Sequence, residues 1–489
     1  MGIIAKQGIK NSVSIYLGFL IGGIYTILLV PKVFEQNPEE WGLARLLVSI
    51  AMLIVPWVQF SIPNTVIKFY SRFSKEKIGK FIFAVYFWLT VLIIVSLVIV
   101  ISLKNIILTE NANSLLSENY LLIIPLFLGY ILFEVFSAFS RVHFKSVLPV
   151  FLKEFIFRIY VLTLILAYYF RYLTFDRFIF FYAFSYAFIF LIIGFDYFLS
   201  FKQKLKIDFN FLFSKEMKPI YRYAFFLLLS TGAAMIVLNI DNVMINKFLS
   251  LSDIAIYSVW FYLATTISVP LRSINGIAAP VISKCFTDND TKTIKSIYKK
   301  SSITPLIISI LIFFILWYNV DLIKLYFGDT FGKNEHILLF IAIGNLVNVA
   351  SGVNGTIITL SEYYKSDIVF QILLVGFIII TNLIFIPHFQ IEGVAIATAL
   401  SLILINVIRL IFVSVKLKMQ PFSKQTVILL VFSTGIFLLS MLFGPSENVW
   451  NHIIYTMFFS VLYLSFVYFV KISEDINSVI DKFLFRKKK

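Results

Sequence analysis

Apolar stretches of roughly 20 residues recur along the whole sequence, and they constrain the fold more than any other feature. About 20 apolar residues in a helix cross a hydrocarbon core of roughly 30 Å. The chain is 60% hydrophobic and only 14% charged over 489 residues, whereas about 25% of the residues in soluble domains are charged. A water-soluble fold cannot cover that much apolar surface. The sequence therefore predicts an all-α, polytopic membrane protein.

The apolar stretches predict fourteen transmembrane helices. Only helices and closed barrels satisfy their backbone hydrogen bonds in lipid, and these stretches lack the alternation of a barrel strand. The first one follows Lys6 and Lys10 but has no small-residue cleavage site, so we expect a retained span rather than a signal peptide. The predicted spans are 11–33, 41–63, 80–103, 119–140, 147–170, 177–200, 219–247, 253–281, 301–320, 335–360, 366–387, 391–415, 424–444 and 449–470.

The net charge of +16 is distributed in a way that predicts the orientation. In a soluble chain such a charge would suggest nucleic acid. Here the lysines fall between apolar segments, where cytoplasmic loops collect positive charge, so we expect no nucleic-acid partner. With the N-terminus inside, the inner segments hold several times more cations than the outer ones, and both termini are cytoplasmic. The outer segments hold only Lys32, Lys104, Arg171, Arg177, Lys247, Lys324 and Lys333.

The loops predict how the helices are grouped. No loop exceeds about 20 residues, which leaves no room for an extramembrane catalytic domain. The loop at 201–218 splits the chain after six helices, and an offset of about 216 positions superposes Trp41 on Tyr257 and Ser49 on Thr265. Both features agree with a parallel repeat of six-helix lobes. The predicted parts are an N-terminal lobe at 1–208, a C-terminal lobe at 209–418, and helices 13 and 14 with a basic tail at 419–489.

Two predicted helices carry a polar stripe that contains an arginine. At about 100° per residue, the second helix places Arg45 and Gln59 on the face of Ser49, and the eighth places Arg272 and Asn275 on one face. A charge at a helix centre costs about 2.5–3.5 kcal/mol on insertion scales, so such charges face protein or a water-filled cavity. The same stripes are also expected if these polar side chains contact a neighbouring helix. The depth of Arg272 favours a cavity.

Further charges lie on the fourth, fifth and seventh helices. Glu154 and Arg158 are spaced i,i+4 on the fifth helix, which predicts an ion pair, and Arg158 lies near the midplane. Glu134 on the fourth helix is expected either to pair with Arg158 or to carry a proton. Asp241 on the seventh helix points away from the face that holds Asn242. We expect it either to pair with an arginine of a neighbouring helix or to act in cation coupling or gating.

The first helix carries a different pattern. Gly18 and Gly22 form a G-x-x-x-G face, which usually allows close packing of helices.

The sequence offers no catalytic or metal-binding constellation. The single cysteine, Cys285, excludes an intrachain disulfide. No Walker motif is present, so we expect no ATP hydrolysis by this chain. A membrane-embedded glycan polymerase, ligase or glycosyltransferase would need a sizeable outer loop or an acidic catalytic pair, and neither is present. We therefore expect a protein that is not an enzyme and has no cofactor, with H⁺ or Na⁺ as the candidate coupling ion.

Three segments resemble one group of membrane proteins. The stretch from Asp241 to Val259 resembles the start of the second lobe in polysaccharide flippases of the multidrug/oligosaccharidyl-lipid/polysaccharide exporter superfamily. NPEEWGLARLL at 37–47 resembles the outer turn between their first two helices. IPHFQIEGVAIATALS at 386–401 resembles their eleventh-to-twelfth turn. The resemblance covers the whole chain and fits the helix count.

The resemblance implies two six-helix bundles in a V around a central cavity, two extra helices, and alternating access. It also implies transfer of undecaprenyl-pyrophosphate-linked oligosaccharide from the inner to the outer leaflet of the bacterial inner (cytoplasmic) membrane, for lipopolysaccharide or capsule assembly. The implied partners are the polyprenyl-pyrophosphate-linked glycan, membrane lipids and a glycan polymerase complex. In this function the candidate substrate-binding residues are Arg45, Arg158, Arg272, Gln59 and Asn275, and the candidate coupling or gating residues are Asp241 and Glu134.

Two rival functions belong to the same superfamily. A cation-coupled drug antiporter would usually have twelve helices and acidic cavity residues, so the predicted helix count and cavity arginines argue against it. A lipid II flippase has fourteen helices and a cationic cavity, which makes it the nearer rival.

Overall fold

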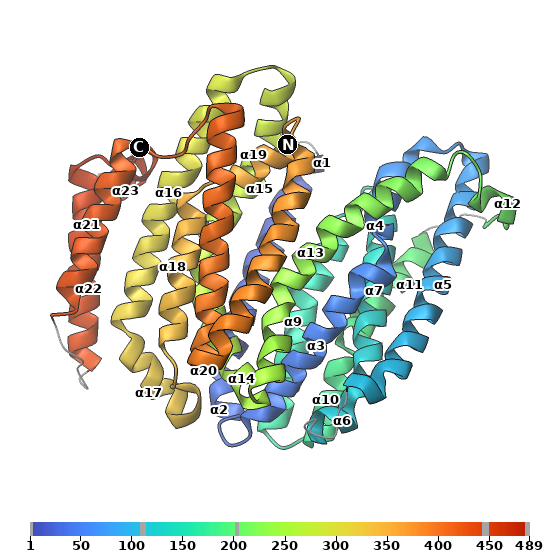
Figure 1. Cartoon of the computed structure of the whole chain (residues 1–489), viewed down its shortest axis with the longest axis horizontal. Helices are drawn as coiled ribbons and strands as arrows, with labels where there is room; N and C mark the ends of the chain where they lie inside the picture. Colours follow the sequence, from blue (N-terminus) through green and yellow to red (C-terminus); the bar gives the residue numbers. More distant parts are fainter. Residues whose placement is uncertain (1–2, 108–113, 201–204, 443–448, 485–489) are drawn as a thin grey trace. The chain divides into compact units, whose positions relative to one another are not determined.

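The computed structural model describes residues 3–107, 114–200, 205–442 and 449–484, and all regular structure in these ranges is helical (Figure 1). This confirms the predicted all-α class. Contacts within the chain divide it into two compact units, Met1–Ala255 and Ile256–Lys489. The predicted lobes at 1–208 and 209–418 rest on the repeat and the loop lengths, and they stay a prediction.

The first unit is built from long apolar helices joined by short ones. Its elements are α1 (Ile3–Gly23), η1 (Ile24–Leu29), α2 (Val30–Val33), α3 (Pro38–Gln59), α4 (Ile62–Phe69), η2 (Tyr70–Arg72), α5 (Lys75–Ile107), α6 (Ser114–Asn119), η3 (Tyr120–Leu122), α7 (Ile123–Val142), α8 (Val147–Phe151), η4 (Leu152–Ile156), α9 (Phe157–Tyr169), α10 (Phe175–Ala183), α11 (Ser185–Ser200), α12 (Phe209–Leu212), α13 (Lys218–Phe248) and the start of α14 (Leu251–Thr265).

The second unit begins within α14 and has the same character. It continues through η5 (Thr266–Ser268), α15 (Val269–Thr287), α16 (Thr291–Tyr318), α17 (Val320–Phe331), α18 (His336–Ala350), α19 (Asn354–Leu360), α20 (Tyr364–Leu417), α21 (Lys424–Ser440), α22 (Val449–Phe469) and α23 (Glu474–Leu484).

Local backbone geometry explains where two of the long helices break. Phe60 and Ser61 take left-handed φ values of 44° and 52°, which end α3 before the next helix starts at Ile62, with Pro63 in its first turn. Such φ values are uncommon outside glycine. Inside the 54-residue α20, Gln390 is non-helical, with φ 52° and ψ −131°, three residues after Pro387. This break lies between the predicted spans 366–387 and 391–415.

Close packing in the first unit involves small and polar residues. A Cβ atom on Gly18 would collide with the backbone carbonyl of Glu154, so the expected close approach at Gly18 is observed. The Asn242 side-chain amide of α13 donates a hydrogen bond to the Ser49 hydroxyl of α3 at 2.8 Å. The polar stripe of the second predicted helix therefore serves helix packing at Ser49.

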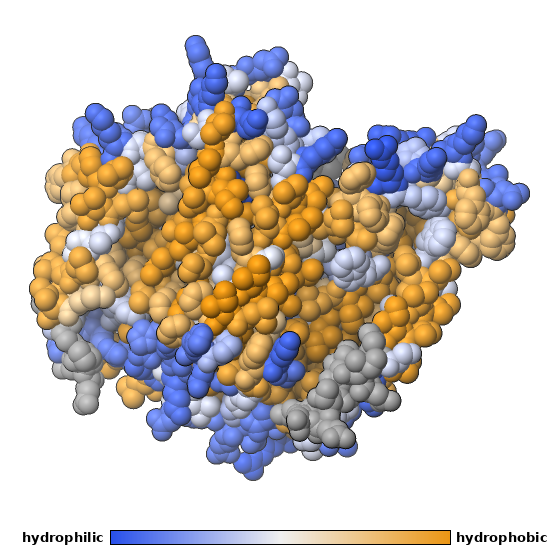
Figure 2. Space-filling view, in the orientation of Figure 1, coloured by the Kyte–Doolittle hydropathy of each residue, from blue (hydrophilic) through white to orange (hydrophobic). Residues whose placement is uncertain are grey.

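The described residues include nine helices that are long and apolar enough to cross a membrane, or up to eleven when two bent pairs each count as one span. In each unit hydrophobic residues gather over the middle of the helices and hydrophilic residues at their ends (Figure 2). The chain is thus a multi-pass membrane protein. Fourteen spans stay a prediction, because α20 counts as one helix, α21 has only 17 residues, and the segment from Val147 to Tyr169 contains three charges.

Candidate functional site

Two of the ion pairs of the first unit join residues within its predicted spans. Arg158 Nη2 lies 3.1 Å from Glu154 Oε2, which confirms the predicted i,i+4 pair. Glu134 pairs with Lys153 instead of Arg158, with 2.5 Å between Lys153 Nζ and Glu134 Oε1. Lys153 also donates to the Tyr130 hydroxyl at 3.1 Å. The expectation that Glu134 pairs with Arg158 was therefore wrong, and Lys153 is a candidate residue that sequence reasoning missed.

Arg45 adds a third cation to this region. Its guanidinium interacts electrostatically with the Tyr182 side chain, and both Arg45 and Arg158 interact electrostatically with Tyr25. The Arg45 Nε and Arg158 Nη1 groups are buried and have no hydrogen-bond partner among the described residues. We call Arg45, Glu134, Lys153, Glu154 and Arg158 the N-unit cluster. It holds three cations and two carboxylates, so its net charge is positive.

Both π-helical segments of the described residues contribute to this region. Tyr25 lies on η1, and Lys153 and Glu154 lie on η4. A π-helical turn inserts one residue into an α-helix and shifts the side chains that follow, and such turns often occur at functional sites. Here the shift presents consecutive charges of η4 to different partners: Lys153 to Glu134 on α7, and Glu154 to Arg158 on α9.

Two other predicted residues of the first unit lie elsewhere on α3 and α13. Gln59 is the last residue of α3, directly before the left-handed Phe60, and is partly exposed. Asp241 is buried on α13, with 8% of its surface exposed, beside the buried Asn242. Their predicted roles in binding and gating stay predictions.

The second unit contains the remaining predicted residues. Arg272 and Asn275 lie on α15, and Arg272 is exposed. Within the described chain Arg272 has no carboxylate within ion-pair distance, which leaves its guanidinium available to an anionic group. Asn275 accepts a hydrogen bond from the Thr356 hydroxyl of α19 at 3.2 Å, so this part of the second polar stripe serves helix packing.

A polar network on α18, α19 and α20 was not anticipated. Asn406 links Asn354 and Asn348 through hydrogen bonds of 3.2 Å each. One turn further along α20, Arg409 Nη2 lies 3.1 Å from Asp367 Oδ1, and both side chains are largely buried. A buried ion pair with both partners present does not by itself indicate a ligand. We assign this network to the packing of the second unit.

The arrangement suits recognition of an anion better than bond chemistry. Guanidinium groups with unsatisfied N–H donors bind phosphate oxygens, often in a bidentate manner. No group of three or more His, Cys, Asp or Glu side chains within the described ranges is placed to hold a metal ion.

The fold and these charges define a class: helical membrane proteins with charged residues inside their bundles. The model of a family described as polysaccharide biosynthesis protein matches residues 5–286, which is more than half of the chain, and the chain belongs to this family. The predicted relationship to polysaccharide exporters of the multidrug/oligosaccharidyl-lipid/polysaccharide exporter superfamily is confirmed. Members of this superfamily are transporters, and the protein is not an enzyme.

Solved structures share the fold. A lipid II flippase, MurJ, in an inward closed conformation matches with a TM-score of 0.76 at 16% identity, covering 95% of this chain and 100% of that one. An inward-facing multidrug resistance transporter of the MATE family matches with a TM-score of 0.55 at 12% identity, covering 84% and 98%. A superfamily transporter from Pyrococcus furiosus matches with a TM-score of 0.52 at 13% identity, covering 84% and 96%. No curated protein matches the chain in sequence.

Proposed function

We propose that the protein flips an undecaprenyl-pyrophosphate-linked oligosaccharide from the inner to the outer leaflet of the bacterial cytoplasmic membrane. The glycan is destined for a surface polysaccharide such as lipopolysaccharide or capsule, and a glycan polymerase complex receives it. The match to the polysaccharide biosynthesis family over residues 5–286 carries this proposal. No covalent bond is made or broken.

The pyrophosphate is the part of this substrate whose transfer through the membrane costs the most free energy. Burial of an unpaired charge in a low-dielectric medium carries a large desolvation penalty, so a carrier must offer cations along the route. The polyprenyl tail needs no carrier because it stays in lipid. In the proposed function Arg272 binds the pyrophosphate, and Arg45 and Arg158 offer further donors through the N–H groups that lack partners.

The other candidate residues have supporting roles in this proposal. Gln59 and Asn275 contribute polar contacts to the substrate. Asp241 and Glu134 couple transport to a cation or gate it. Lys153 forms an ion pair with Glu134 at 2.5 Å, so movement of either side chain would expose a charged group to a proton or to the substrate.

The proposed mechanism is alternating access by the two predicted lobes, with both termini in the cytoplasm. The fourteen predicted spans and the positive-inside distribution of lysines are consistent with this topology. Rocking of the lobes would turn the bound pyrophosphate from one leaflet to the other.

Proteoliposomes that contain this protein alone test the proposed function. A fluorescent pyrophosphate-linked lipid oligosaccharide should move between leaflets with its mass unchanged, as measured by protection from a membrane-impermeant reductant and by mass spectrometry. The same assay with lipid II as the substrate tests the nearer rival function, that of a lipid II flippase. Faster transfer of lipid II than of the oligosaccharide lipid would replace the proposed substrate.

A further inference from the structure

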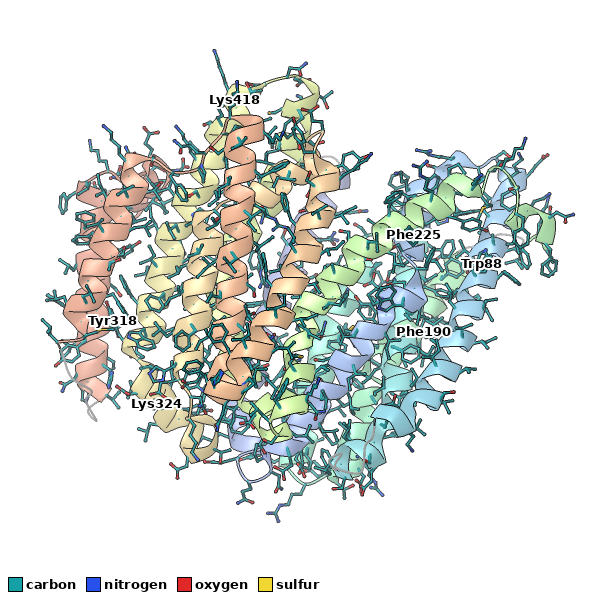
Figure 3. The ribbon with its side chains drawn as sticks, viewed as in Figure 1. Trp88, Phe190, Phe225, Tyr318, Lys324 and Lys418 are labelled. Atoms are coloured by element: carbon teal, nitrogen blue, oxygen red, sulfur yellow. The ribbon has the colours of Figure 1, made fainter. Side chains whose placement is uncertain are left out.

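A cavity of about 390 Å³ lies within the first unit, between α4, α5 and α13. Its wall includes Ile62 and Thr65 of α4, Ala84 and Trp88 of α5, and Ala224 of α13. Trp88 projects from α5 and Phe225 lies on α13 (Figure 3). The cavity is separate from the N-unit cluster, whose residues do not line it.

The few polar groups on the wall already have partners. The Thr65 hydroxyl donates to the Ser61 carbonyl at 3.0 Å. The Trp88 indole N–H donates to the Tyr221 hydroxyl at 2.8 Å, and that hydroxyl donates to the Leu212 carbonyl at 2.7 Å. A polar ligand would find no unsatisfied group here, and its own polar atoms would be buried without partners, which is unfavourable. The wall therefore suits a hydrocarbon chain.

The longest elements around the cavity, α5 and α13, are apolar helices long enough to cross a membrane. The span from Glu76 to Ser102 is among the most apolar of the chain. Phe225 and Phe226 of α13, next to the lining Ala224, are 52% and 48% exposed. These exposed apolar side chains beside the cavity suit contact with a bilayer lipid.

Cations collect about one helical turn beyond the cavity wall. Lys68 follows the lining Thr65 by three residues, and its Nζ lies 3.7 Å above the Tyr223 ring. Arg72 lies over the Phe69 ring at 4.9 Å. Arg222 stands between the lining residues Tyr221 and Ala224 and contacts the Phe226 ring. All three are exposed.

These cations are not neutralised by the neighbouring acids. Asp208 is held by Lys80 at 2.7 Å, and Glu216 by Lys77 at 2.6 Å. In the described part of the chain no carboxylate lies within ion-pair distance of Lys68, Arg72 or Arg222. The region therefore has a positive charge that a phosphate headgroup would complement.

We propose that this cavity binds one acyl chain of an anionic phospholipid from the bilayer, with the lipid phosphate bound by Lys68, Arg72 and Arg222. An apolar cavity and an adjacent excess of cations match the two halves of such a lipid. The site requires no particular transported substrate, so it does not depend on the proposed function. Each juxtamembrane cation should contribute about a fivefold preference for an anionic over a zwitterionic headgroup.

Native mass spectrometry of the full-length protein in detergent tests this proposal. Phosphatidylglycerol and phosphatidylcholine with identical chains are titrated separately. We expect one phosphatidylglycerol to bind more tightly than any later one and at least fivefold more tightly than phosphatidylcholine. Ala224→Trp fills the cavity and should abolish that first binding step. Leu191→Trp, at a position that is 66% exposed on α11, is the matched control and should leave it unchanged.

A separate pair of variants tests the contacts between the lipid headgroup and the cations. Arg72→Gln should weaken phosphatidylglycerol binding about fivefold without affecting phosphatidylcholine, and Arg177→Gln, an exposed arginine on α10, should affect neither. Equal affinity for the two lipids, or wild-type phosphatidylglycerol binding by folded Ala224→Trp, would overturn the proposal. So would displacement of phosphatidylglycerol by a lower concentration of undecaprenyl phosphate, because the occupant would then be a polyprenyl chain.

A measurement on the unfilled cavity keeps the proposal testable if Ala224→Trp does not fold. Brominated acyl chains quench tryptophan on contact, so nanodiscs with a minor fraction of brominated phosphatidylglycerol should quench Trp88 more than the same fraction of brominated phosphatidylcholine. The contribution of Trp88 is the part that disappears in Trp88→Phe. Equal quenching by the two lipids would contradict a selective site.

Discussion

At the residue scale, a charged side chain indicates a ligand site when it has no ion-pair partner within the protein. Most intramembrane charges of this protein have partners: Glu154 with Arg158, Glu134 with Lys153, and Asp367 with Arg409. Arg272 has none in the described chain and is exposed on α15. An exposed guanidinium within an apolar span is costly unless an anion or water accompanies it.

Replacement of Arg272 should therefore affect transport more than folding. Arg272→Ala should lower the initial flipping rate about tenfold or more, because hydrogen bonds to charged groups contribute about 1.5–3 kcal/mol. Arg272→Lys should recover only part of the rate, since lysine keeps the charge but loses the planar fork. The rates are measured in proteoliposomes at matched protein content. Near-normal flipping by a normally inserted Arg272→Ala would remove Arg272 from the substrate site.

Replacement of either residue of the Glu134–Lys153 pair should also lower the stability of the protein. Glu134→Gln alone or Lys153→Met alone should lower the free energy of unfolding by about 1–3 kcal/mol, the cost of a buried polar group left without its partner. The double variant should recover much of this loss, because both charges are then removed. Thermal unfolding in detergent measures all three variants. Additive losses in the double variant would show that the two side chains do not interact.

At the element scale, the first helix packs through glycine where a side chain cannot fit. A Cβ on Gly18 would meet the Glu154 carbonyl of η4, whereas a Cβ on Gly435 of α21 would meet nothing within 4 Å. The two positions thus offer the same substitution in two environments.

Gly18→Ala should destabilise the protein by about 1–3 kcal/mol, as overpacking typically does. Gly435→Ala should be neutral or stabilising by up to about 1 kcal/mol, because alanine favours a helix over glycine. Melting temperatures of the two variants in one detergent provide the comparison. A Gly18→Ala protein as stable as Gly435→Ala would show that α1 does not approach η4 closely.

The sequence predicted the positions of the helices better than it predicted which charged side chains contact one another. Apolar length located the helices, and the i,i+4 spacing located the pair of Glu154 and Arg158, because both signals are local along the chain. The partner of Glu134 was missed because helical periodicity gives the face of a residue but not its neighbour on another helix. Lys153 lies within the predicted span 147–170 and received no predicted role, yet the π-helical turn of η4 directs it toward α7.

At the scale of the whole molecule, topology follows from charge. The predicted fourteen spans place Lys75, Asn210 and Asp290 in the cytoplasm and Asn113 and Thr330 outside; Asn113 lies beyond the described residues. With Cys285 replaced by serine, single cysteines at the first three positions should not react with an impermeant maleimide in intact cells, and those at the last two should react. Labelling at position 290 from outside would contradict the orientation.

The central claim is that this chain alone moves an intact lipid-linked oligosaccharide across a bilayer. The most direct measurement is the leaflet distribution of a pyrophosphate-linked lipid oligosaccharide in proteoliposomes, followed over time together with its mass. We expect exchange between leaflets at unchanged mass, slowed about tenfold or more by Arg272→Ala. A substrate that stays in its original leaflet in the presence of folded protein, or a product of altered mass, would contradict it.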